Sequence, residues 1–249
     1  FYSEKMMLDL RFNILNNNVH KFIVVESCFS HSGKKKNYNF NIDDYPKFKD
    51  KIIYLKITEE PNGLYKDKND FKNSSYKRLN SIKRIEQSYD HMMKGIIDAE
   101  DDDLIIISDN DEIPNLDSKK FKESNKNFII FKQLLFYYKF NLFHELMPWF
   151  GSKACKKNII LFKQLFFYYK FDLFYDLMPW FGSKACKKKS LKSFSWLNNL
   201  KGKKYPFWRL DTLFSQNKII NLEIINDGGW HFTNLKSPKD LYEKFNNFG

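Results

Sequence analysis

The stretch that decides the fold is Asp103–Pro114, which reads DLIIISDNDEIP. Its apolar run is typical of a buried strand, and the acidic residues follow directly where that strand ends. Because side chains alternate along an extended backbone, Asp109 and Asp111 project on the same side. Two carboxylates placed in this way form a hard-oxygen site for Mg²⁺ or Mn²⁺, metals that commonly hold substrate phosphates.

The acidic turn has a second interpretation, because a bare DxD is common and acidic residues after a strand often form only a solvated turn. The upstream run Asp101–Asp103 is itself interpreted as a solvated loop. A metal bridging two phosphate oxygens would instead stabilise the charge on a leaving nucleoside diphosphate. The position of the turn after an apolar strand keeps both interpretations open.

A second unusual segment is Gly228–Phe232, which reads GGWHF. Two glycines allow a tight backbone path. His231 is then placed to complete a metal site or to contact a phosphate. The plainer interpretation is a buried, hydrogen-bonded histidine beside an aromatic cluster, and the segment taken alone favours that one.

The rest of the chain alternates between helical and strand patterns. Apolar residues at helical spacing predict helices, and short β-branched runs predict strands. Strands that alternate with helices indicate an α/β domain with a largely parallel sheet, whose ligands sit at the carboxyl ends of the strands. The expected helices cover residues 3–16 and 78–99 and begin again at Ser237, and the expected strands cover Lys21–Glu26, Lys51–Ile57, Asp103–Ser108 and 220–224.

An internal repeat interrupts this pattern. Residues 127–157 and 158–188 are identical at 25 of 31 positions. A solenoid needs about three or more copies to bury a continuous core, so two copies indicate a recent tandem duplication. We expect one copy to supply the sheet strand (FKQLLFYYKF or FKQLFFYYKF) and the other to pack beside it or protrude.

Composition sets broad bounds. The 249 residues, 43% of them hydrophobic, suffice for one large domain with a real core. Three cysteines, none of them in a CxxC pair, exclude a disulfide scaffold and disfavour structural zinc. The net charge of +12 would suit nucleic acid, an anionic membrane or a phosphate-bearing substrate. We discount this charge, because a codon bias toward A and T enriches Lys, Asn, Ile and Phe together.

Location and oligomeric state are only loosely bounded. No signal peptide is visible, and no apolar stretch reaches the ~18 residues of a membrane span. We expect a cytoplasmic or peripheral membrane protein, and a Golgi lumenal one only if an N-terminal anchor is missing from a chain that opens on Phe1. The sequence does not indicate an oligomeric state.

Other motifs are absent from the sequence. There is no GxxxxGK[ST], GxGxxG or GxSxG, and His144-Glu145 is followed by Leu-Met-Pro, which rules out HExxH. Guanidinium groups grip phosphate bidentately, so arginines are the most plausible diphosphate partners. For each of them taken singly, a solvated surface role is the favoured interpretation: Arg78, Arg84 and Arg209.

Several segments together resemble a known family. They are residues 1–27, SHSGKKK at 30–36, DDDLIIISDNDEIP at 101–114, a WFGSKACKK segment, and NDGGWHFTNLKSP at 226–238. The chain resembles the glycosyltransferase family that contains the β-1,4-mannosyl-glycoprotein N-acetylglucosaminyltransferase, which adds bisecting GlcNAc to N-glycans. Bacterial and viral members also belong to this family, and we expect a member of that type with an internal duplication.

The resemblance implies an A-type (Rossmann-like) glycosyltransferase fold over residues 1–249, with a mixed, mostly parallel sheet. It implies metal-dependent transfer of a sugar, GlcNAc from UDP-GlcNAc, to a glycan hydroxyl with inversion. The implied metal ligands are Asp109, Asp111 and His231. The implied nucleotide-binding residues are Glu26, Ser27, Ser30, Arg84 and Asp109. The candidate general bases, left unranked, are Asp227, Glu112 and Asp211.

Two departures from the family leave an alternative open. The family carries the duplicated segment once, and its members continue past the NFG segment, so we expect truncation at Gly249. The alternative is a non-catalytic homologue that binds only nucleotide or glycan. The expected partners are a nucleotide sugar and a glycan acceptor, with peripheral membrane association possible. A nucleic-acid partner ranks lowest, because no basic-aromatic recognition motif accompanies the charge.

Overall fold

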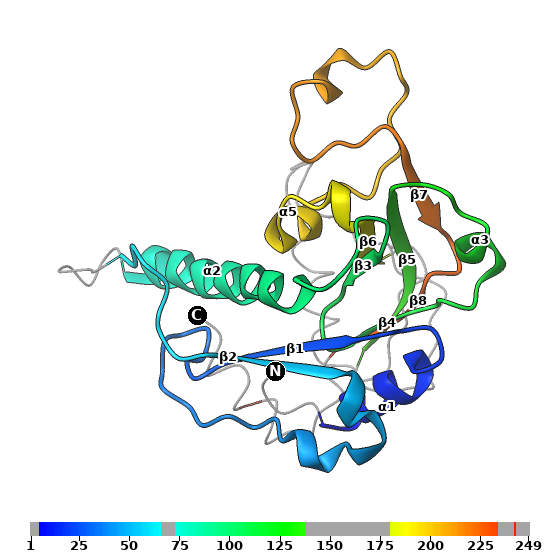
Figure 1. Ribbon diagram of the computed structural model, residues 1–249. Helices are drawn as coiled ribbons and strands as arrows, with labels where there is room; N and C mark the ends of the chain where they lie inside the picture. Colours follow the sequence, from blue (N-terminus) through cyan, green and yellow to red (C-terminus); the bar gives the residue numbers. More distant parts are fainter. Residues whose placement is uncertain (1–4, 66–72, 138–179, 234–241, 243–249) are drawn as a thin grey trace.

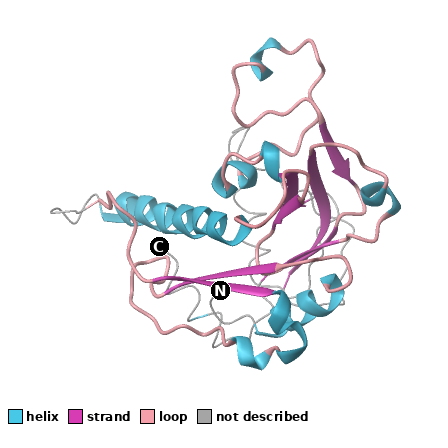
Figure 2. Cartoon of the chain, viewed as in Figure 1, coloured by secondary structure: helices cyan, strands magenta, loops and turns pink. Residues whose placement is uncertain are grey.

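The computed structural model describes residues 5–65, 73–137, 180–233 and residue 242. These residues form a mixed α/β structure with two separate groups of strands (Figure 1). A two-stranded sheet lies below a curled six-stranded sheet, and one long helix runs beside both. Figure 2 shows the strands at the centre of the described chain and the short helices around them.

The first unit contains a helix and two parallel strands. Helix α1 (Lys5–Leu15) precedes β1 (Phe22–Ser27), and β2 (Ile52–Ile57) pairs with β1 in parallel from Phe22↔Ile52 to Ser27↔Ile57. The predicted helix and both predicted strands are therefore confirmed. Aromatic side chains hold the helix to the strands, because the Phe12 ring packs against those of Phe22, Tyr45 and Phe48.

The long helix leads to the strand that carries the acidic turn. Helix α2 (Asn73–His91) continues as the short helix η4 (Met92–Ile96), and β3 (Leu104–Ile107) follows. Both elements agree with the sequence pattern. Ile96, Ile105 and Ile107 share a buried cluster with Phe194 and Leu197, so this packing fixes β3 beneath η4.

The six-stranded sheet has the order β3-β6-β5-β8-β4, and β7 pairs with β5 beside β8. The first half of β5 pairs with β7 and its second half with β8, both in parallel. The remaining strands are β4 (Glu112–Pro114), β5 (Phe128–Tyr137), β6 (Trp180–Lys187), β7 (Leu222–Ile225) and β8 (Gly229–Thr233). The short helices are η1 (Ile42–Asp44), η2 (Pro46–Lys51), α3 (Lys119–Lys122), η5 (Lys188–Ser190), α5 (Phe194–Asn198) and η6 (Leu210–Thr212).

The prediction of a mostly parallel sheet is wrong for the six-stranded sheet. The pairs β3–β6, β5–β6 and β4–β8 are antiparallel. Strands β3 and β5 do run in the same direction, as alternation of strands and helices predicts. Strand β6 lies between them in the opposite direction, and it converts what would be one parallel contact into two antiparallel ones.

The two repeat copies both contribute to the sheet, but through different parts. Strand β5 lies at the start of the first copy, and β6 lies at the end of the second. The strand expected from FKQLLFYYKF is thus present, and its neighbour is the WFGSKACK segment of the other copy. The matching segments 162–171 and 149–156 lie outside the described residues, as does the helix predicted to begin at Ser237.

No helix in the described ranges is both long enough and apolar enough to span a bilayer.

Candidate active site

The acidic turn is held in place from below by the first helix. The turn follows β3, and the Glu112 backbone N–H closes it by donating to the Asp109 carbonyl at 3.1 Å. Arg11 of α1 donates through Nη1 to the carbonyl of Asp109 at 2.7 Å and to that of Glu112 at 2.9 Å. A buried guanidinium therefore fixes the backbone on which the carboxylates stand.

The GGWHF segment lies directly beside this turn. Strand β8 pairs with β4 so that His231 stands opposite Glu112, and the Phe232 N–H donates to the Asp111 carbonyl at 2.8 Å. Gly229 has φ +111°, and a Cβ there would lie 2.0 Å from the Ile113 carbonyl oxygen. The close approach of the two strands requires glycine at this position.

His231 bridges two of the acidic side chains. Its Nε2 lies 3.6 Å from Asp111 Oδ2, and its Nδ1 lies 3.6 Å from Glu112 Oε1. Burial alone would lower the pKa of this imidazole. The interactions with Asp111 and Glu112 outweigh burial and raise the pKa of His231 to about 9. The ring is therefore a cation at neutral pH.

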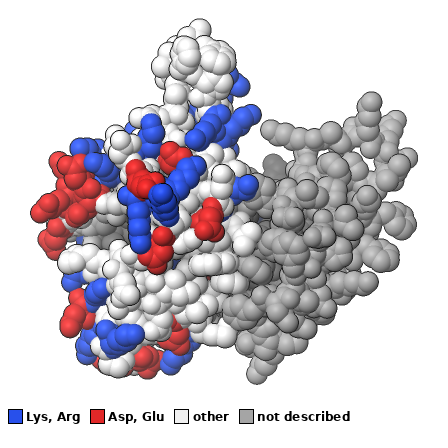
Figure 3. Space-filling view, turned by 90° about the vertical axis from the view of Figure 1, so that its right-hand side faces the viewer, with Lys and Arg blue, Asp and Glu red and all other residues white. Residues whose placement is uncertain are grey.

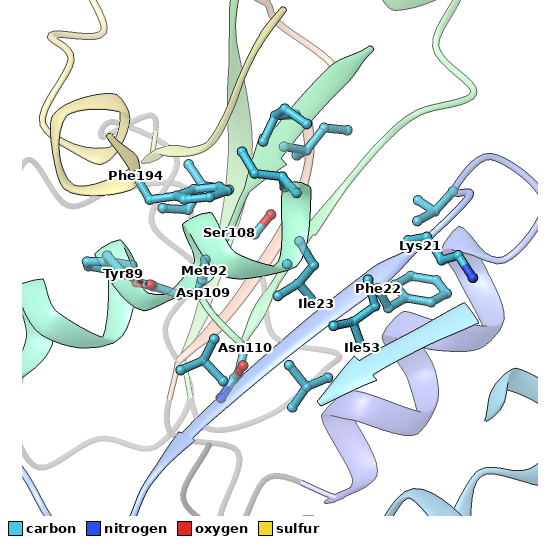
Figure 4. Close-up of a pocket in the computed structure, with 18 of the residues that line it drawn as sticks. Lys21, Phe22, Ile23, Ile53, Tyr89, Met92, Ser108, Asp109, Asn110 and Phe194 are labelled. Atoms are coloured by element: carbon cyan, nitrogen blue, oxygen red, sulfur yellow. Dashed lines mark hydrogen bonds between the residues drawn. The ribbon is translucent and has the colours of Figure 1, made fainter. Parts of the chain in front are cut away.

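Asp109 opens toward solvent at the end of β3, although protein atoms crowd around its carboxylate. Tyr89 of α2 donates its hydroxyl to Asp109 Oδ1 at 2.6 Å (Figure 4). Desolvation, followed by repulsion from Glu112, outweighs that bond and raises the pKa of Asp109 to about 6. The surroundings of Asp109 therefore disfavour its ionised form, despite the hydrogen bond from Tyr89.

The carboxylate of Glu112 is enclosed by strand β6. Ser183 Oγ donates to Glu112 Oε2 at 3.3 Å, and Gln133 Nε2 donates to Ser183 Oγ at 3.0 Å. Next to it, Lys184 donates to the Asn198 carbonyl, and burial lowers the pKa of this lysine to about 8 despite the attraction of Glu112. The repeat therefore supplies polar groups to the acidic cluster.

A pocket of about 1120 Å³ lies between β1 and β3 and reaches the acidic turn. Tyr89, Asp109 and Asn110 lie on one side of it, and Phe22, Ile23 and Ile53 on the other (Figure 4). Ser108 Oγ lines the pocket as well. Within the described part of the chain this hydroxyl is buried and has no hydrogen-bond partner. A bound polar ligand would satisfy it.

Four of the five expected nucleotide-binding residues line this pocket: Ser27, Ser30, Arg84 and Asp109. The Arg84 guanidinium forms a bidentate pair with Glu60, at 2.6 and 3.1 Å, and also donates to the His31 carbonyl. Its fork is therefore already engaged by protein groups, so it contributes shape and charge to the pocket wall.

Glu26 is the exception among these five, because it does not line the pocket. Its carboxylate is fully buried and accepts from Lys36 Nζ at 2.7 Å and from Tyr54 Oη at 2.8 Å. It also accepts from the backbone N–H groups of Asn39 and Phe40. Against desolvation, these donors lower the pKa of Glu26, beginning with Lys36. Glu26 thus holds the loop after β1 in place.

The three candidate bases lie in three different places. Glu112 belongs to the acidic cluster, although it does not line the pocket. Asp211 is exposed in the loop between α5 and β7, where it pairs with Arg209 at 2.7 Å and with Lys218 at 2.5 Å. Asp227 is exposed in the bend before β8, four residues before His231, and accepts from Asn115 Nδ2 at 3.1 Å.

The acidic turn offers ligands to a cation but not a complete cage. Among residues 5–65, 73–137, 180–233 and 242, no three His, Cys, Asp or Glu side chains stand in ligand geometry. Mg²⁺ and Mn²⁺ are usually held by one or two carboxylates together with substrate phosphates and water. Two pocket-lining carboxylates with excess negative charge fit such a shared site.

Sequence patterns missed Arg11, Tyr89, Ser183 and Lys184 as parts of the site. Tyr89 was predictable only as one residue of an apolar helix face, and the others carry no local signal. Each reaches the turn from an element that is distant in the sequence.

Comparison with known proteins is consistent with this geometry. Residues 1–163 match the family described as glycosyltransferase family 17. The chain belongs to this family. It is therefore a glycosyltransferase by family, for which glycosyl transfer from a sugar donor to a glycan acceptor is the expected chemistry. A search of curated proteins and a search of solved structures each returned no match.

The family-17 match covers the N-terminal part of the site and stops before the rest. It includes α1, β1, α2, β3 and the acidic turn. The strands β6 and β8, which bring Lys184 and His231 to that turn, lie beyond residue 163. Their contribution to the cluster therefore rests on the contacts described above.

Proposed function

We propose that this family-17 chain is a metal-dependent, inverting glycosyltransferase that moves GlcNAc from UDP-GlcNAc to a glycan hydroxyl on an A-type fold. The observation that carries the proposal is the acidic turn Asp109–Glu112, which opens at a pocket and is bracketed by His231. Excess negative charge at a pocket is characteristic of catalytic sites, because it is costly elsewhere.

The donor diphosphate fits at the acidic turn, together with a divalent ion. Asp109 and Asp111 would hold Mn²⁺ or Mg²⁺, and the ion, when bound, would neutralise charge on the departing UDP. Since both nitrogens of His231 face carboxylates, we assign it the role of positioning Asp111. The nucleotide would extend along the wall that contains Ser27, Ser30 and Ser108.

The general base is the remaining role. An inverting transfer needs a carboxylate that removes the proton of the acceptor hydroxyl opposite the leaving group. Asp211 and Asp227 are separated from the acidic cluster, so Glu112 is the candidate that the geometry favours among the three. The test of this role is Glu112→Gln, which should lower the rate of transfer while UDP binding is retained.

One observation supports the alternative of a chain that binds without turnover. None of the three candidate bases is among the residues that line the described pocket. A binding-only homologue would bind UDP in the presence of Mn²⁺ and would release no UDP from UDP-GlcNAc with any glycan acceptor.

The deciding experiment compares Asp111→Asn with wild type in two assays. In an assay of UDP release from UDP-GlcNAc with Mn²⁺, the variant should be slower by about 10²-fold, the usual effect of removing one transition-state contact. In calorimetry, the Mn²⁺-dependent part of UDP binding should disappear. The matched control is Asp43→Asn, an exposed carboxylate paired with Lys49 outside the site. Equal rates for Asp111→Asn and wild type would contradict the proposal that Asp111 holds a divalent ion.

A further inference from the structure

Residues 201–218 form a loop that projects from the top of the molecule, between α5 and β7 (Figure 1). Its two ends are tied together, because the Lys201 N–H donates to the Asn217 carbonyl at 2.9 Å. Trp196 Nε1 donates to the Gln216 carbonyl at 2.7 Å and fixes the base to α5. A compact loop with closed ends and an exposed tip is a frequent carrier of function.

The tip of the 201–218 loop is strongly apolar and open to solvent. Five large side chains fall within eight consecutive positions, and their exposed fractions run from 67% for Trp208 to 90% for Phe214. The Phe207 and Trp208 rings contact each other edge to face, with centroids 5.1 Å apart. A contiguous apolar tip of this kind marks an interaction site rather than an ordinary solvated surface. The five are Phe207, Trp208, Leu210, Leu213 and Phe214.

Basic residues surround the base of the tip. The loop contains five lysines and arginines and one acidic residue, a net charge of +4. That acid, Asp211, is already paired with Arg209 and Lys218. Figure 3 shows the projection as a largely uncharged lobe with Lys and Arg near its base. The basic residues are Lys201, Lys203, Lys204, Arg209 and Lys218.

We propose that the 201–218 loop docks the protein on an anionic lipid surface, with its aromatic tip in the headgroup region and its lysines against the lipid phosphates and carboxylates. Stable peripheral binding needs an apolar insertion and a basic patch together, and the loop has both. Aromatic side chains favour the membrane interface, and each lysine near an anionic leaflet adds attraction.

The positive charge of the 201–218 loop favours an anionic membrane over a second copy of the chain as the partner that covers its apolar tip. Two copies meeting tip to tip would bring two +4 loops together, which opposes association. An anionic bilayer complements the same charge. The match to glycosyltransferase family 17 ends before this loop, so the proposal stands apart from the proposed transfer reaction.

The experiment is co-sedimentation of the whole chain with vesicles. Wild type should bind vesicles of equal parts phosphatidylcholine and phosphatidylserine, and should bind pure phosphatidylcholine vesicles much less. The double variant Phe207→Ser, Phe214→Ser should lose binding by about tenfold or more, because two apolar side chains no longer insert. Ile97→Ser is the matched control, because Ile97 is 73% exposed but lies outside the loop.

A second variant tests the charge. Lys201→Glu with Lys203→Glu should lower binding to the mixed vesicles by a similar factor and leave binding to pure phosphatidylcholine unchanged. Both pairs of substitutions are at the surface, and thermal melting should show unchanged folding.

Three results would overturn the proposal. The first is equal binding of wild type and both loop variants to the mixed vesicles. The second is no binding of wild type to them at all. The third is self-association of wild type, seen by sedimentation velocity without lipid and lost in the phenylalanine variant, because a second copy would then cover the tip. None of these results depends on whether the chain transfers sugar.

Discussion

Two acidic regions of this molecule stabilise their charge to different extents. In the first, the single carboxylate of Glu26 accepts four hydrogen bonds, one of them from Lys36, and its pKa is lowered. In the second, Asp109, Asp111 and Glu112 crowd one turn, and the pKa of Asp109 is raised to about 6. One arrangement stabilises the folded protein, and the other strains it.

The direction of the carboxyl pKa shift distinguishes a structural carboxylate, Glu26, from a candidate site carboxylate, Asp109. Their positions in the sequence do not. Glu26 lies near the end of β1, and the acidic turn follows β3. Arg11 lies beneath the acidic turn, yet it donates to two backbone carbonyls there, at Asp109 and Glu112. The raised pKa of Asp109 lies at the turn to which we assign the donor diphosphate, and perturbed carboxyl pKa values cluster at such sites.

The largest expected effect is on the scaffold. Glu26→Ala removes the buried carboxylate that accepts from the Lys36 ammonium and from the backbone N–H groups of Asn39 and Phe40. We expect unfolding to become easier by about 3–5 kcal/mol, as for other broken buried pairs. For a chain of this size the melting temperature should fall by roughly 6–20 °C.

The same substitution in the acidic turn is the comparison for this measurement. Asp109→Ala removes a carboxylate whose pKa is raised and should leave the melting temperature nearly unchanged. If both alanine variants lowered it equally, the distinction between scaffold and site would be wrong.

Local sequence patterns were enough to place the acidic turn and the main elements around it. An apolar strand followed by DND, and a glycine pair before Trp230 and His231, each depend on neighbours in the chain. The structure does bring His231 against Asp111. Glu26 shows the limit of this reasoning. Its position after a strand pattern suggested a nucleotide contact, whereas its role depends on Lys36 and Tyr54, which no local pattern connects to it.

Strand order was less predictable than strand position. The repeat hides which copy provides which strand, because 25 of its 31 positions are identical in both. Pairing of β5 from the first copy with β6 from the second is decided by long-range contacts. The sheet direction was mispredicted for the same reason, since β6 enters between β3 and β5 from a distant part of the chain.

The next largest expected effect is a loss of stability at the contact between β8 and β4, which borders the acidic turn. Gly229→Ala would place a Cβ 2.0 Å from the Ile113 carbonyl at φ +111°, so β8 must move away from β4. We expect a loss of about 2–3 kcal/mol in stability from backbone strain. Chemical denaturation would measure it.

Gly63→Ala is the control for that loss. Gly63 also has a positive φ, +69°, but the nearest atom to an added Cβ is the flexible Lys83 Nζ at 3.4 Å. Its cost should be about 1 kcal/mol, from backbone conformation alone. Equal losses at both glycines would mean that the close contact between β8 and β4 adds no strain at Gly229.

The scaffold carboxylate also predicts a pH dependence. Because the folded-state pKa of Glu26 lies below its ordinary value of 4.5, its stabilisation is present above pH 4.5 and is lost as the pH falls through the folded-state value. The gap in melting temperature between wild type and Glu26→Gln should therefore narrow in acid. Ordinary carboxylates titrate at roughly pH 4. If the gap in melting temperature stayed constant from neutral pH to roughly pH 3, ionised Glu26 would not be the source of the stabilisation.

The smallest expected effect is a gain in stability, and it comes from a substitution in the acidic turn. The raised pKa of Asp109 means that ionising it costs the folded state stability as the pH rises from the model-peptide value of 3.8 to about 6. Asp109→Asn removes that charge and retains an oxygen for the Tyr89 hydroxyl. Since the carboxylate opens to solvent and is partly screened, we expect a gain of only about 0.5–1 kcal/mol at neutral pH.

Added Mn²⁺ and UDP should make wild type the more stable of the two proteins, because these ligands bind wild type and have less to bind in the variant. A variant less stable than wild type without ligand would show that the charge of Asp109 is already balanced, and the contrast with Glu26 would then disappear.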